Sequence, residues 1–589
     1  MKPLRRADYV IAAVVFVGSL ALFLRTTGMG FTRDEGFYFH AASLYIGWFE
    51  DLWRNLFAGN LGESFTRENI DQHWSYNPEH PVVMKASFAL SHKFFHEILG
   101  WMSPSTAWRF PTMITASFLL SGLYLFGRQL AGAWAGIVAV FALLLQPRFF
   151  FHAHMACFDV AITAASFWVI YAYWKSFDSR RWAVATGVFF GLALSIKLNA
   201  FFLPLILVGH WVILNWREFR LHLRPKTLGG PDDRRGPSFE IPPIPLAFWS
   251  MAILGPLLFY ALWPRHWFET FQRIRWYMNF HLEHEHYFVN YFGQNLQVPP
   301  FPISYPFGMT LFTVPATILL AGLLGSLWYF FDTGQHRRIQ SVIRDLRARR
   351  LPLPTENADP RGTGWLLVIN LIFPIALIAM PNTPIFGGTK HWMPAMPFLA
   401  LFAGFAVAAA AGAIAPVIVQ LLPRWHRLAI AALPLVLTLA VAVPAGVATH
   451  QNHPFGTAYY NELIGSYRGA ADHRMVRKFW GHSSRQALPF LNEDAPEGAS
   501  VWIHKILRTA WQVYQEEELA RPDLRATSQR ASDYALYHQQ KAFVFVLLPL
   551  WEEYGTMAPV HVVEIQGVPL VSVYRRPAPG ELKYPDVWR

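Results

Sequence analysis

The sequence predicts a mainly α-helical, polytopic membrane protein with about eleven spans and a small C-terminal α+β domain. Hydrophobic residues make up 53% of its 589 residues and charged residues only 15%, whereas about a quarter of a soluble domain is charged. Apolar runs of roughly 17 to 22 residues recur, which is the length that a helix needs to cross a bilayer. These runs stop near residue 449. We therefore expect a transmembrane domain over residues 1–449 and a separate domain over residues 450–589.

The net charge and the cysteine content narrow the class of protein further. A formal charge of +12 would suggest nucleic-acid binding in a soluble chain. Here the basic residues lie in short loops between apolar runs, where they set the orientation in the membrane, so we expect no nucleic-acid partner. Cys157 is the single cysteine, which excludes an intrachain disulfide. No N-x-S/T sequon occurs, and this favours a bacterial inner (plasma) membrane.

The first span fixes the orientation of the chain. Lys2, Arg5 and Arg6 precede the apolar run Tyr9–Leu24, and no small-residue cleavage pattern follows it. We interpret the run as an uncleaved span with a cytoplasmic N-terminus. The acidic pair Asp34–Glu35 then emerges on the outer face.

The remaining apolar runs alternate in direction across the membrane. They are Thr106–Gly127, Gly132–Leu145, Val160–Trp174, Trp182–Ile196, Ala200–Trp216, Pro245–Trp263, Met309–Phe331, Gly364–Met380, Met393–Ala415 and Leu428–Val447. The loops that this order puts inside are rich in arginine and lysine, as the positive-inside rule requires. Their basic residues are Arg128, Arg180, Arg181, Arg217, Arg220, Arg224, Lys226, Arg234, Arg235, Arg337, Arg338, Arg344, Arg347, Arg349, Arg350, Arg424 and Arg427.

Two segments depart from this pattern. Val82–Gly100 is apolar in part but carries several charged residues, and counting it as a span would invert every later loop. We expect an amphipathic helix at the outer interface, within the first outer loop over residues 25–105. In the C-terminal domain, "VWIHK" at 501, "AFVFV" at 542 and "VHVVEIQGVPLVSVYRR" from Val560 predict strands, the last as a hairpin that turns near Gly567.

Polar side chains from several separate segments collect at the predicted outer boundary. They are Arg33, Asp34, Glu35, Glu79, His80, Lys85, Arg148, His152, His154, Asp159, Lys197, Asn199, Lys390 and His391. Ionisable groups at a membrane boundary cost free energy unless they are paired or hydrated, and they often mark a site. Any one of them could be a surface ion pair or an interfacial anchor. Their convergence from many loops favours a shared substrate site.

The outer loop over residues 264–306 contains "HLEHEH", with His281, His284 and His286. Histidines at this spacing can supply metal ligands. The three do not share one face of a helix or of a strand, so a hydrated loop that contacts substrate through His284 is the favoured interpretation. Metal binding stays open.

Carboxylates that face cations at a membrane-level site suit group transfer from a lipid phosphate. The phosphate leaving group needs cations to neutralise its developing charge. The attacking hydroxyl needs a base within hydrogen-bond reach, and an aspartate can serve. The residues therefore indicate a transferase with a polyprenyl-phosphate donor, without identifying the transferred group.

Four segments resemble the GT-C membrane glycosyltransferases, in the branch of the protein O-mannosyltransferases and aminoarabinose transferases. They are "TRDEGFYFHAA" from Thr32, "EHPVVMK" from Glu79, "HAHMACFDV" from His152 and "LALSIKLNAFFLP" from Leu192. The resemblance covers residues 1 to about 215 well. "HPFGTAYYNELIG", from His453, resembles a segment after the last span of bacterial relatives.

The resemblance implies specific roles. Asp34 would be the base that activates the acceptor, with support from Glu35, and Asp159 would orient the sugar or the acceptor. Lys85, Lys197 and His80 would bind the donor phosphate. The other residues expected to contact donor or acceptor are Arg33, His152, His154, Asn199, His284, Lys390 and His391. No cofactor is required, and a divalent metal stays open, because the family includes members with and without metal. The expected partners are a polyprenyl-phosphate-linked sugar, membrane lipids and a protein, lipid or glycan acceptor.

Two other functions compete with glycosyl transfer. A flippase for polyprenyl-linked glycans would need polar or broken helices near the bilayer midplane, whereas the ionisable residues here collect at one face. A receptor or scaffold that used residues 450–589 for binding would leave Asp34 unexplained. The sequence does not identify the sugar or the acceptor.

Overall fold

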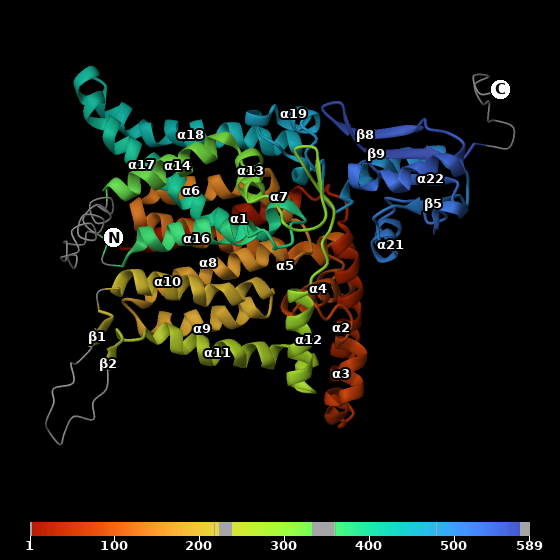
Figure 1. Ribbon diagram of the computed structural model, residues 1–589, viewed down its shortest axis with the longest axis horizontal. Helices are drawn as coiled ribbons and strands as arrows, with labels where there is room; N and C mark the ends of the chain where they lie inside the picture. The colour runs from red at the N-terminus through yellow and green to blue at the C-terminus, as the bar shows by residue number, and fades with distance from the viewer. Residues whose placement is uncertain are drawn as a thin grey trace, which may run out of the picture.

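The computed structural model describes residues 3–216, 218–222, 238–332, 359, 361–478 and 480–577. Its largest part is a bundle of apolar helices that run side by side (Figure 1). The bundle consists of α1 (Arg6–Arg25), α5 (Pro104–Ala131), α6 (Ala133–Leu144), α8 (Asp159–Ser176), α9 (Arg180–Leu194), α10 (Leu203–Asn215), α11 (Leu246–Leu262), α14 (Ala316–Asp332), α16 (Thr363–Ile378), α17 (Met396–Leu421) and α18 (His426–Asn452). Each lies on one of the predicted spans, and the predicted class, a polytopic helical membrane protein, is confirmed.

Length and composition alone identify fewer of these helices as spans. Among the described residues, five helices are long and apolar enough to cross a membrane. They are α1, α5, α10 with the 3₁₀ turn η3 (Leu198–Phe202), α17 with the 3₁₀ turn η5 (Gly388–Ala395), and α18. The apolar helices α6, α11 and α16 are shorter. The side chains of α8 are almost all buried. The count of about eleven therefore depends on the packing of the bundle as well as on hydropathy.

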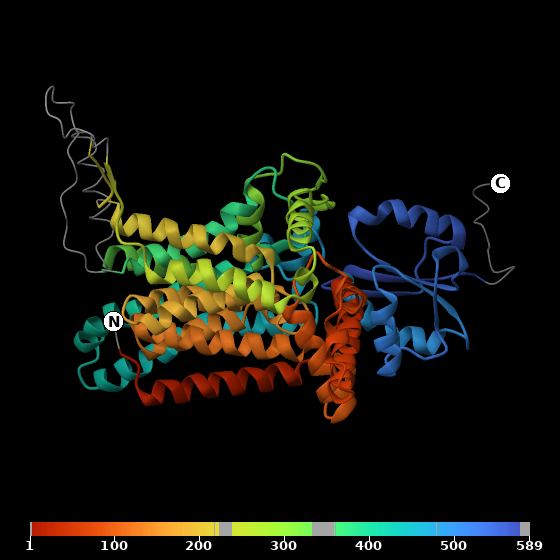
Figure 2. The same ribbon diagram turned by 90° about the horizontal axis from the view of Figure 1, so that it is seen from below.

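A second layer of helices crosses one end of the bundle (Figures 1 and 2). It contains α2 (Arg33–Phe57), α3 (Arg67–Trp74), α4 (Val83–Ser91) and α12 (Thr270–Leu282). The segment Val82–Gly100 forms α4 and a following π-helical turn, η2 (His92–Ile98), and takes no place in the bundle. Smaller elements in the connecting loops are η1 (Leu61–Phe65), α7 (Pro147–His152), η4 (Pro264–Trp267), β3 (Val289–Tyr291), β4 (Gln294–Leu296) and α13 (Ser304–Thr313).

The predicted span Met309–Phe331 is wrong as a single straight helix. The chain bends by 117° between α13 and α14. Val314, the residue before Pro315, is extended (φ −101°, ψ 137°). The ring of a proline disfavours helical geometry in the preceding residue, so the helix breaks at this point. Asn461 satisfies the carbonyl groups that the break exposes. Its Nδ2 donates to Leu311 O (2.6 Å) and Val314 O (2.7 Å).

The C-terminal domain lies beyond the crossing layer (Figure 1). Its five-stranded sheet has the order β6-β5-β7-β9-β8, in which β5 pairs parallel with β6 and β7 while β9 pairs antiparallel with β7 and β8. The strands are β5 (Ser500–Ile503), β6 (Arg525–Thr527), β7 (Tyr534–His538), β8 (His561–Ile565) and β9 (Val568–Arg575). Its helices are α19 (Ser466–Asp472), α20 (Leu488–Asp494), α21 (Arg508–Glu516) and α22 (Val544–Tyr554), with 3₁₀ turns η6 (Gly456–Ala458), η7 (Glu462–Ile464), η8 (His482–Ala487), η9 (Gln529–Ala531) and η10 (Lys541–Phe543).

Two strand predictions in this domain are confirmed and one is wrong. "VWIHK" supplies β5, and the terminal hairpin turns at Gln566 and Gly567, both with positive φ. "AFVFV" is instead η10 and the start of α22. Its β-branched and aromatic residues favour a strand locally, but Leu547, Leu550 and Tyr554 are buried at helical spacing. Tertiary packing therefore overrides local propensity here.

Some expectations fall on residues outside the described ranges. Lys2, most of the 217–236 loop and most of the 332–361 loop belong to this group. In the first of these loops residues 218–222 are described, and they include β1 (Arg220–His222), which pairs with β2 (Ser238–Glu240) just after the loop. The last bundle helix, α18, runs to Asn452, slightly past the expected domain boundary at residue 449.

Candidate active site

The two adjacent carboxylates at the start of α2 have different surroundings. Thr32 caps the helix, and Glu35 accepts from the Thr32 backbone N–H (2.7 Å). The Arg109 guanidinium from α5 donates to both carboxylate oxygens of Glu35 (2.7 and 3.0 Å), and Ala156 N–H donates to one of them (3.0 Å). Glu35 is fully buried. Through these contacts Glu35 ties α2 to α5 and to the loop before α8.

Asp34 faces away from this pair and stays 29% exposed. Its carboxylate lies 3.5 Å from the Lys390 ammonium, which η5 contributes. The ammonium also lies 3.9 Å from the ring centroid of Trp480, a residue of the C-terminal domain. Three distant parts of the sequence therefore meet at Asp34.

A second ion pair lies at the start of α8. Lys197 Nζ donates to Asp159 Oδ1 (2.7 Å), and His152 Nδ1 is 3.6 Å from Asp159 Oδ2. The His152 ring packs against Trp480 with centroids 5.1 Å apart. Trp480 therefore contacts residues of both ion pairs. We call Asp34, Lys390, Asp159, Lys197 and His152, with Trp480, the outer cluster.

Aromatic rings pack beside the cluster. Tyr38, one turn after Asp34, packs on Phe158 (4.3 Å), and His80 contacts both rings at 5.6 and 5.2 Å. Burial lowers the pKa of His80 well below its usual value, and the nearby charges of Lys85, Lys197 and Lys390 lower it further. His80 is therefore neutral near pH 7, and it can offer a hydrogen bond but no positive charge to a phosphate.

Lys85 is fully buried in α4, where its Nζ donates to Asn77 O (2.7 Å) and lies 5.5 Å from the Tyr45 ring centroid. Burial lowers the pKa of Lys85 to about 7. Lys85 acts on His80 through its charge but has no ion pair in the described ranges. A phosphate bound near it would favour its charged form.

Several expected site residues lie outside the outer cluster. His154 bonds to Thr26 Oγ1 (2.9 Å) and Phe23 O (3.1 Å) at the end of α1. Arg33 turns toward the C-terminal domain, and Asn199 is half-buried in η3. His391 follows Lys390 in η5 and packs on Phe386 (4.6 Å), so it stays beside the cluster.

The three histidines of "HLEHEH" are not brought together. His281 bonds to Glu79 O (2.9 Å), His284 stacks on Phe386 (4.9 Å), and His286 packs on Phe301 (5.2 Å). Nowhere in the described chain do three histidine, cysteine or acidic side chains gather in a way that could hold a metal ion. The stack of His284 on Phe386 does put this loop against η5.

Sequence reasoning missed two residues that shape the site. Arg109 falls inside a predicted apolar span, and an ionisable residue in such a span is itself a signal of a buried partner. Trp480 had no such signal, because its role depends on how the C-terminal domain docks on the bundle.

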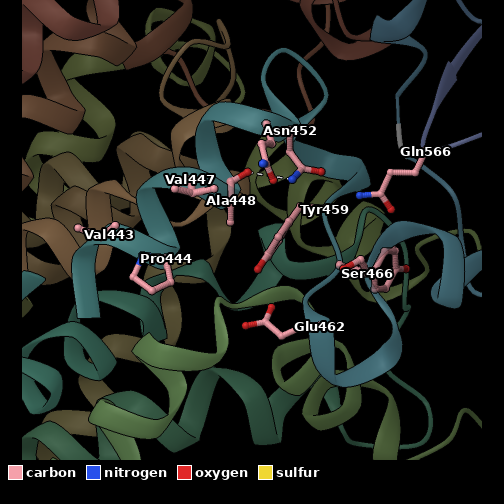
Figure 3. Close-up of a pocket in the computed structure, with 11 residues that line it drawn as sticks. Val443, Pro444, Val447, Ala448, Asn452, Tyr459, Glu462, Ser466 and Gln566 are labelled. Atoms are coloured by element: carbon pink, nitrogen blue, oxygen red, sulfur yellow. Dashed lines mark hydrogen bonds between the residues drawn. The ribbon is translucent and has the colours of Figure 1, made fainter. Parts of the chain in front are cut away.

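One described hollow lies away from the outer cluster. Figure 3 shows it between the end of α18, the loop after that helix and the β8–β9 turn, with a volume of about 300 Å³. Val443 and Val447 form its apolar side, while Tyr459, Glu462 and Gln566 form its polar side. No residue of the outer cluster lines it, so we base the site on the ion pairs.

The cluster combines the groups that glycosyl transfer to a hydroxyl requires. Asp34 is a partly exposed carboxylate that can accept a proton. Lys390 and Lys197 are fixed cations beside it, able to neutralise an anionic leaving group.

The sequence matches a family model in the region that holds half of this site. The match is to the dolichyl-phosphate-mannose-protein mannosyltransferase family over residues 79–229, a range that contains Lys85, His152, Asp159 and Lys197. Among curated proteins, no sequence matches.

Two solved structures align with much of this chain. ArnT from Cupriavidus metallidurans bound to undecaprenyl phosphate is 15% identical, with a TM-score of 0.45 over 96% of this chain and 97% of that one. The Archaeoglobus fulgidus oligosaccharyltransferase in its apo form is 12% identical, with a TM-score of 0.43 over 89% and 65% of the two chains. Residues 79–229 therefore resemble this mannosyltransferase family, within a chain whose described residues form a helical membrane bundle.

Proposed function

We propose that the protein transfers a sugar from a polyprenyl-phosphate donor to a hydroxyl group of an acceptor on the extracytoplasmic face of the membrane. The observation that carries this proposal is the contact of Asp34 with Lys390, 3.5 Å apart, beside the Asp159–Lys197 pair. The name of the matched family, dolichyl-phosphate-mannose-protein mannosyltransferase, supports a lipid-linked donor.

In the reaction, Asp34 accepts the proton of the acceptor hydroxyl as its oxygen attacks the anomeric carbon. The bond from this carbon to the phosphate oxygen breaks, and its electron pair leaves with the polyprenyl phosphate. Lys390 and Lys197 stabilise the charge on the departing phosphate. Asp159 holds Lys197 by a hydrogen bond of 2.7 Å, and it orients the sugar from the same position.

The two acidic residues of the outer cluster are each paired with a basic one. Each carboxylate of the cluster has a lysine partner, so each cation is held in position before substrate arrives. Positioned charges do not have to reorganise during the reaction, and this lowers the barrier. No step requires a cofactor, and a divalent metal is left open.

The proposed extracytoplasmic location is supported by the basic loops at the opposite end of the bundle. Arg128, Arg180, Arg181 and Arg424 lie at the ends of bundle helices away from the crossing layer. The positive-inside rule puts those ends in the cytoplasm.

The test is donor consumption by the purified protein. The protein is incubated in lipid nanodiscs with a panel of polyprenyl-phosphate-linked sugars, and free polyprenyl phosphate is measured by mass spectrometry. Release from one sugar donor supports the proposal, and a matching mass should disappear from the envelope lipids, glycans or proteins of a deletion strain. No release from any donor, with an unchanged envelope, would overturn it.

A further inference from the structure

A small cavity lies between the start of α2 and the C-terminal domain, and Trp480 is one of its lining residues. Its volume is about 130 Å³, and it is lined mainly by Arg33, Lys478, Trp480, Lys505 and His538, which we call the basic pocket. The Arg33 N–H donates to Trp480 O (2.8 Å), which joins the two sides of the pocket. Thr509 Oγ1 also donates to Gly36 O (2.7 Å), so the C-terminal domain is anchored on α2 beside it.

The pocket concentrates positive charge without a compensating carboxylate. None of its lining residues is acidic. Over the described ranges, no ion pair involves Arg33, Lys478 or Lys505. Lys478 is only 2% exposed and donates to Leu570 O, while Lys505 lies 4.6 Å from the Phe543 ring centroid.

Burial of the basic side chains of the pocket costs desolvation free energy, which a bound anion can offset. Desolvation lowers the pKa of Lys478 well below its usual value, and the Arg477 charge lowers it further. His538 is 1% exposed, and its Nδ1 has no hydrogen-bond partner in the described structure. Buried cations without counter-ions are unfavourable, and an anion in the pocket would remove that cost.

The pocket shares a wall with the catalytic site. The ring of Trp480 contacts Lys390 at 3.9 Å and His152 at 5.1 Å, and Trp480 also lines the pocket. Arg33 and Asp34 are consecutive residues at the start of α2, and they point to the two sides of this wall. The two sites are therefore adjacent.

We propose that the basic pocket binds a phosphate monoester on the acceptor, while a hydroxyl of the same acceptor reaches Asp34; this rests on the glycosyl-transfer function above. The cavity of about 130 Å³ is well below the roughly 300–1,000 Å³ of a whole-ligand site, so it holds one charged group. A phosphate monoester carries about −1.5 to −2 charges near pH 7, which suits a pocket with three basic side chains better than the single charge of a carboxylate does. Its binding would also favour the charged form of Lys478. The C-terminal domain thereby selects the acceptor.

Lysine footprinting with inorganic phosphate tests the site directly on the full-length protein. The acylation rate of Lys505 is measured by mass spectrometry at constant ionic strength, with phosphate or acetate added. Phosphate should slow labelling of Lys505 at least threefold, and acetate should have little effect. Lys541 is the matched control, because it is exposed on the same domain and bonds only to Gly293 O (3.2 Å).

The variant Lys478→Met tests the contribution of the Lys478 charge in the same footprinting experiment. It keeps a buried unbranched side chain while removing the charge, and it should abolish the protection of Lys505. Equal protection of Lys541, no protection of Lys505, or protection that survives in Lys478→Met would overturn the site. Acetate protection equal to that of phosphate would overturn the choice of a phosphate monoester.

A kinetic measurement distinguishes binding of the acceptor in the basic pocket from binding of the donor. In Lys505→Met, the ratio of sugar transferred to a phosphate-bearing acceptor over sugar released to water should fall about tenfold. An unchanged ratio with a parallel loss of both products would reassign the pocket to the donor and overturn the proposal. If the wild type consumes no donor at all, the proposed function fails, whereas the footprint still reports on phosphate binding.

Discussion

Asp34 and Glu35 are neighbours in the sequence with opposite surroundings. One carboxylate is 29% exposed beside Lys390, and the other is buried with the Arg109 guanidinium. The difference arises because consecutive side chains point in different directions from a helix. The buried Glu35 therefore supports the structure, and the proposed chemical role falls on Asp34.

We predict that Glu35→Gln destabilises the protein far more than Asp34→Asn. The first variant leaves the buried Arg109 charge without its counter-ion, a loss of about 3–5 kcal/mol. The second removes a partly exposed partner of Lys390, at a cost of about 1 kcal/mol or less. Thermal unfolding of both variants in the same detergent measures the difference, and equal melting temperatures would contradict the assigned roles.

Lys85 gives a prediction for the pH dependence of stability. Burial lowers its pKa to about 7, whereas a lysine in the unfolded chain has a pKa of about 10.4. Between these values the unfolded state binds more protons, so the contribution of Lys85 to stability rises with pH through that window.

Lys85→Met should remove this pH dependence. At pH 6 to 7 the variant should be more stable than the wild type by about 3–5 kcal/mol, and the gap should close near pH 10.4. Denaturant unfolding across this range is the measurement. A variant that is less stable than the wild type at pH 6 would show that the lysine charge is well compensated in the folded state.

The elements show which features of the fold local sequence can predict. The bundle helices and the terminal hairpin follow from long apolar runs and from alternation around Gly567, and both are found. The strand prediction for "AFVFV" is wrong, because this segment begins a helix. The buried spacing of Leu547 and Leu550 in α22 depends on a partner surface that lies elsewhere in the chain.

The break between α13 and α14 has a signal in the local sequence. The Val314–Pro315 step inside the apolar run is a probable helix boundary. What the sequence could not indicate is the remote residue that satisfies the exposed carbonyls. Asn461 does so from the segment after α18, which explains why an asparagine stands in "HPFGTAYYNELIG".

Asn461→Asp tests this explanation with almost no change in shape. The aspartate has no N–H to donate to Leu311 O and Val314 O, so two buried carbonyls lose their partner. We expect a loss of about 2–3 kcal/mol, seen as a lower melting temperature. Asn279→Asp, on an exposed position of α12, is the control, and an equal effect of the two substitutions would refute the role of Asn461.

At the scale of the whole molecule, the candidate site is built from parts that meet only in the fold. Asp159 and Lys197 come from segments whose polar residues at the ends of apolar runs were visible in the sequence. Trp480 and the basic pocket depend on the docking of the C-terminal domain on α2, which no local pattern reports.

The orientation of the whole molecule can be measured by cysteine labelling. Cys157 is the single cysteine and is buried, so new cysteines report without background. Glu63→Cys in η1 should react with a membrane-impermeant maleimide added outside intact cells. Arg424→Cys, in the loop between α17 and α18, should react only after the membrane is opened. The reverse pattern would put the outer cluster in the cytoplasm.

The most direct test of the central claim is the rate of donor consumption by Asp34→Asn. The purified variant and the wild type are compared with the same polyprenyl-phosphate sugar, after thermal unfolding has shown that both are folded, with Glu63→Gln as an exposed-carboxylate control. The base role predicts that transfer by Asp34→Asn falls by about 10²-fold or more, while Glu63→Gln stays at the wild-type rate. Transfer by Asp34→Asn at the wild-type rate would contradict the account.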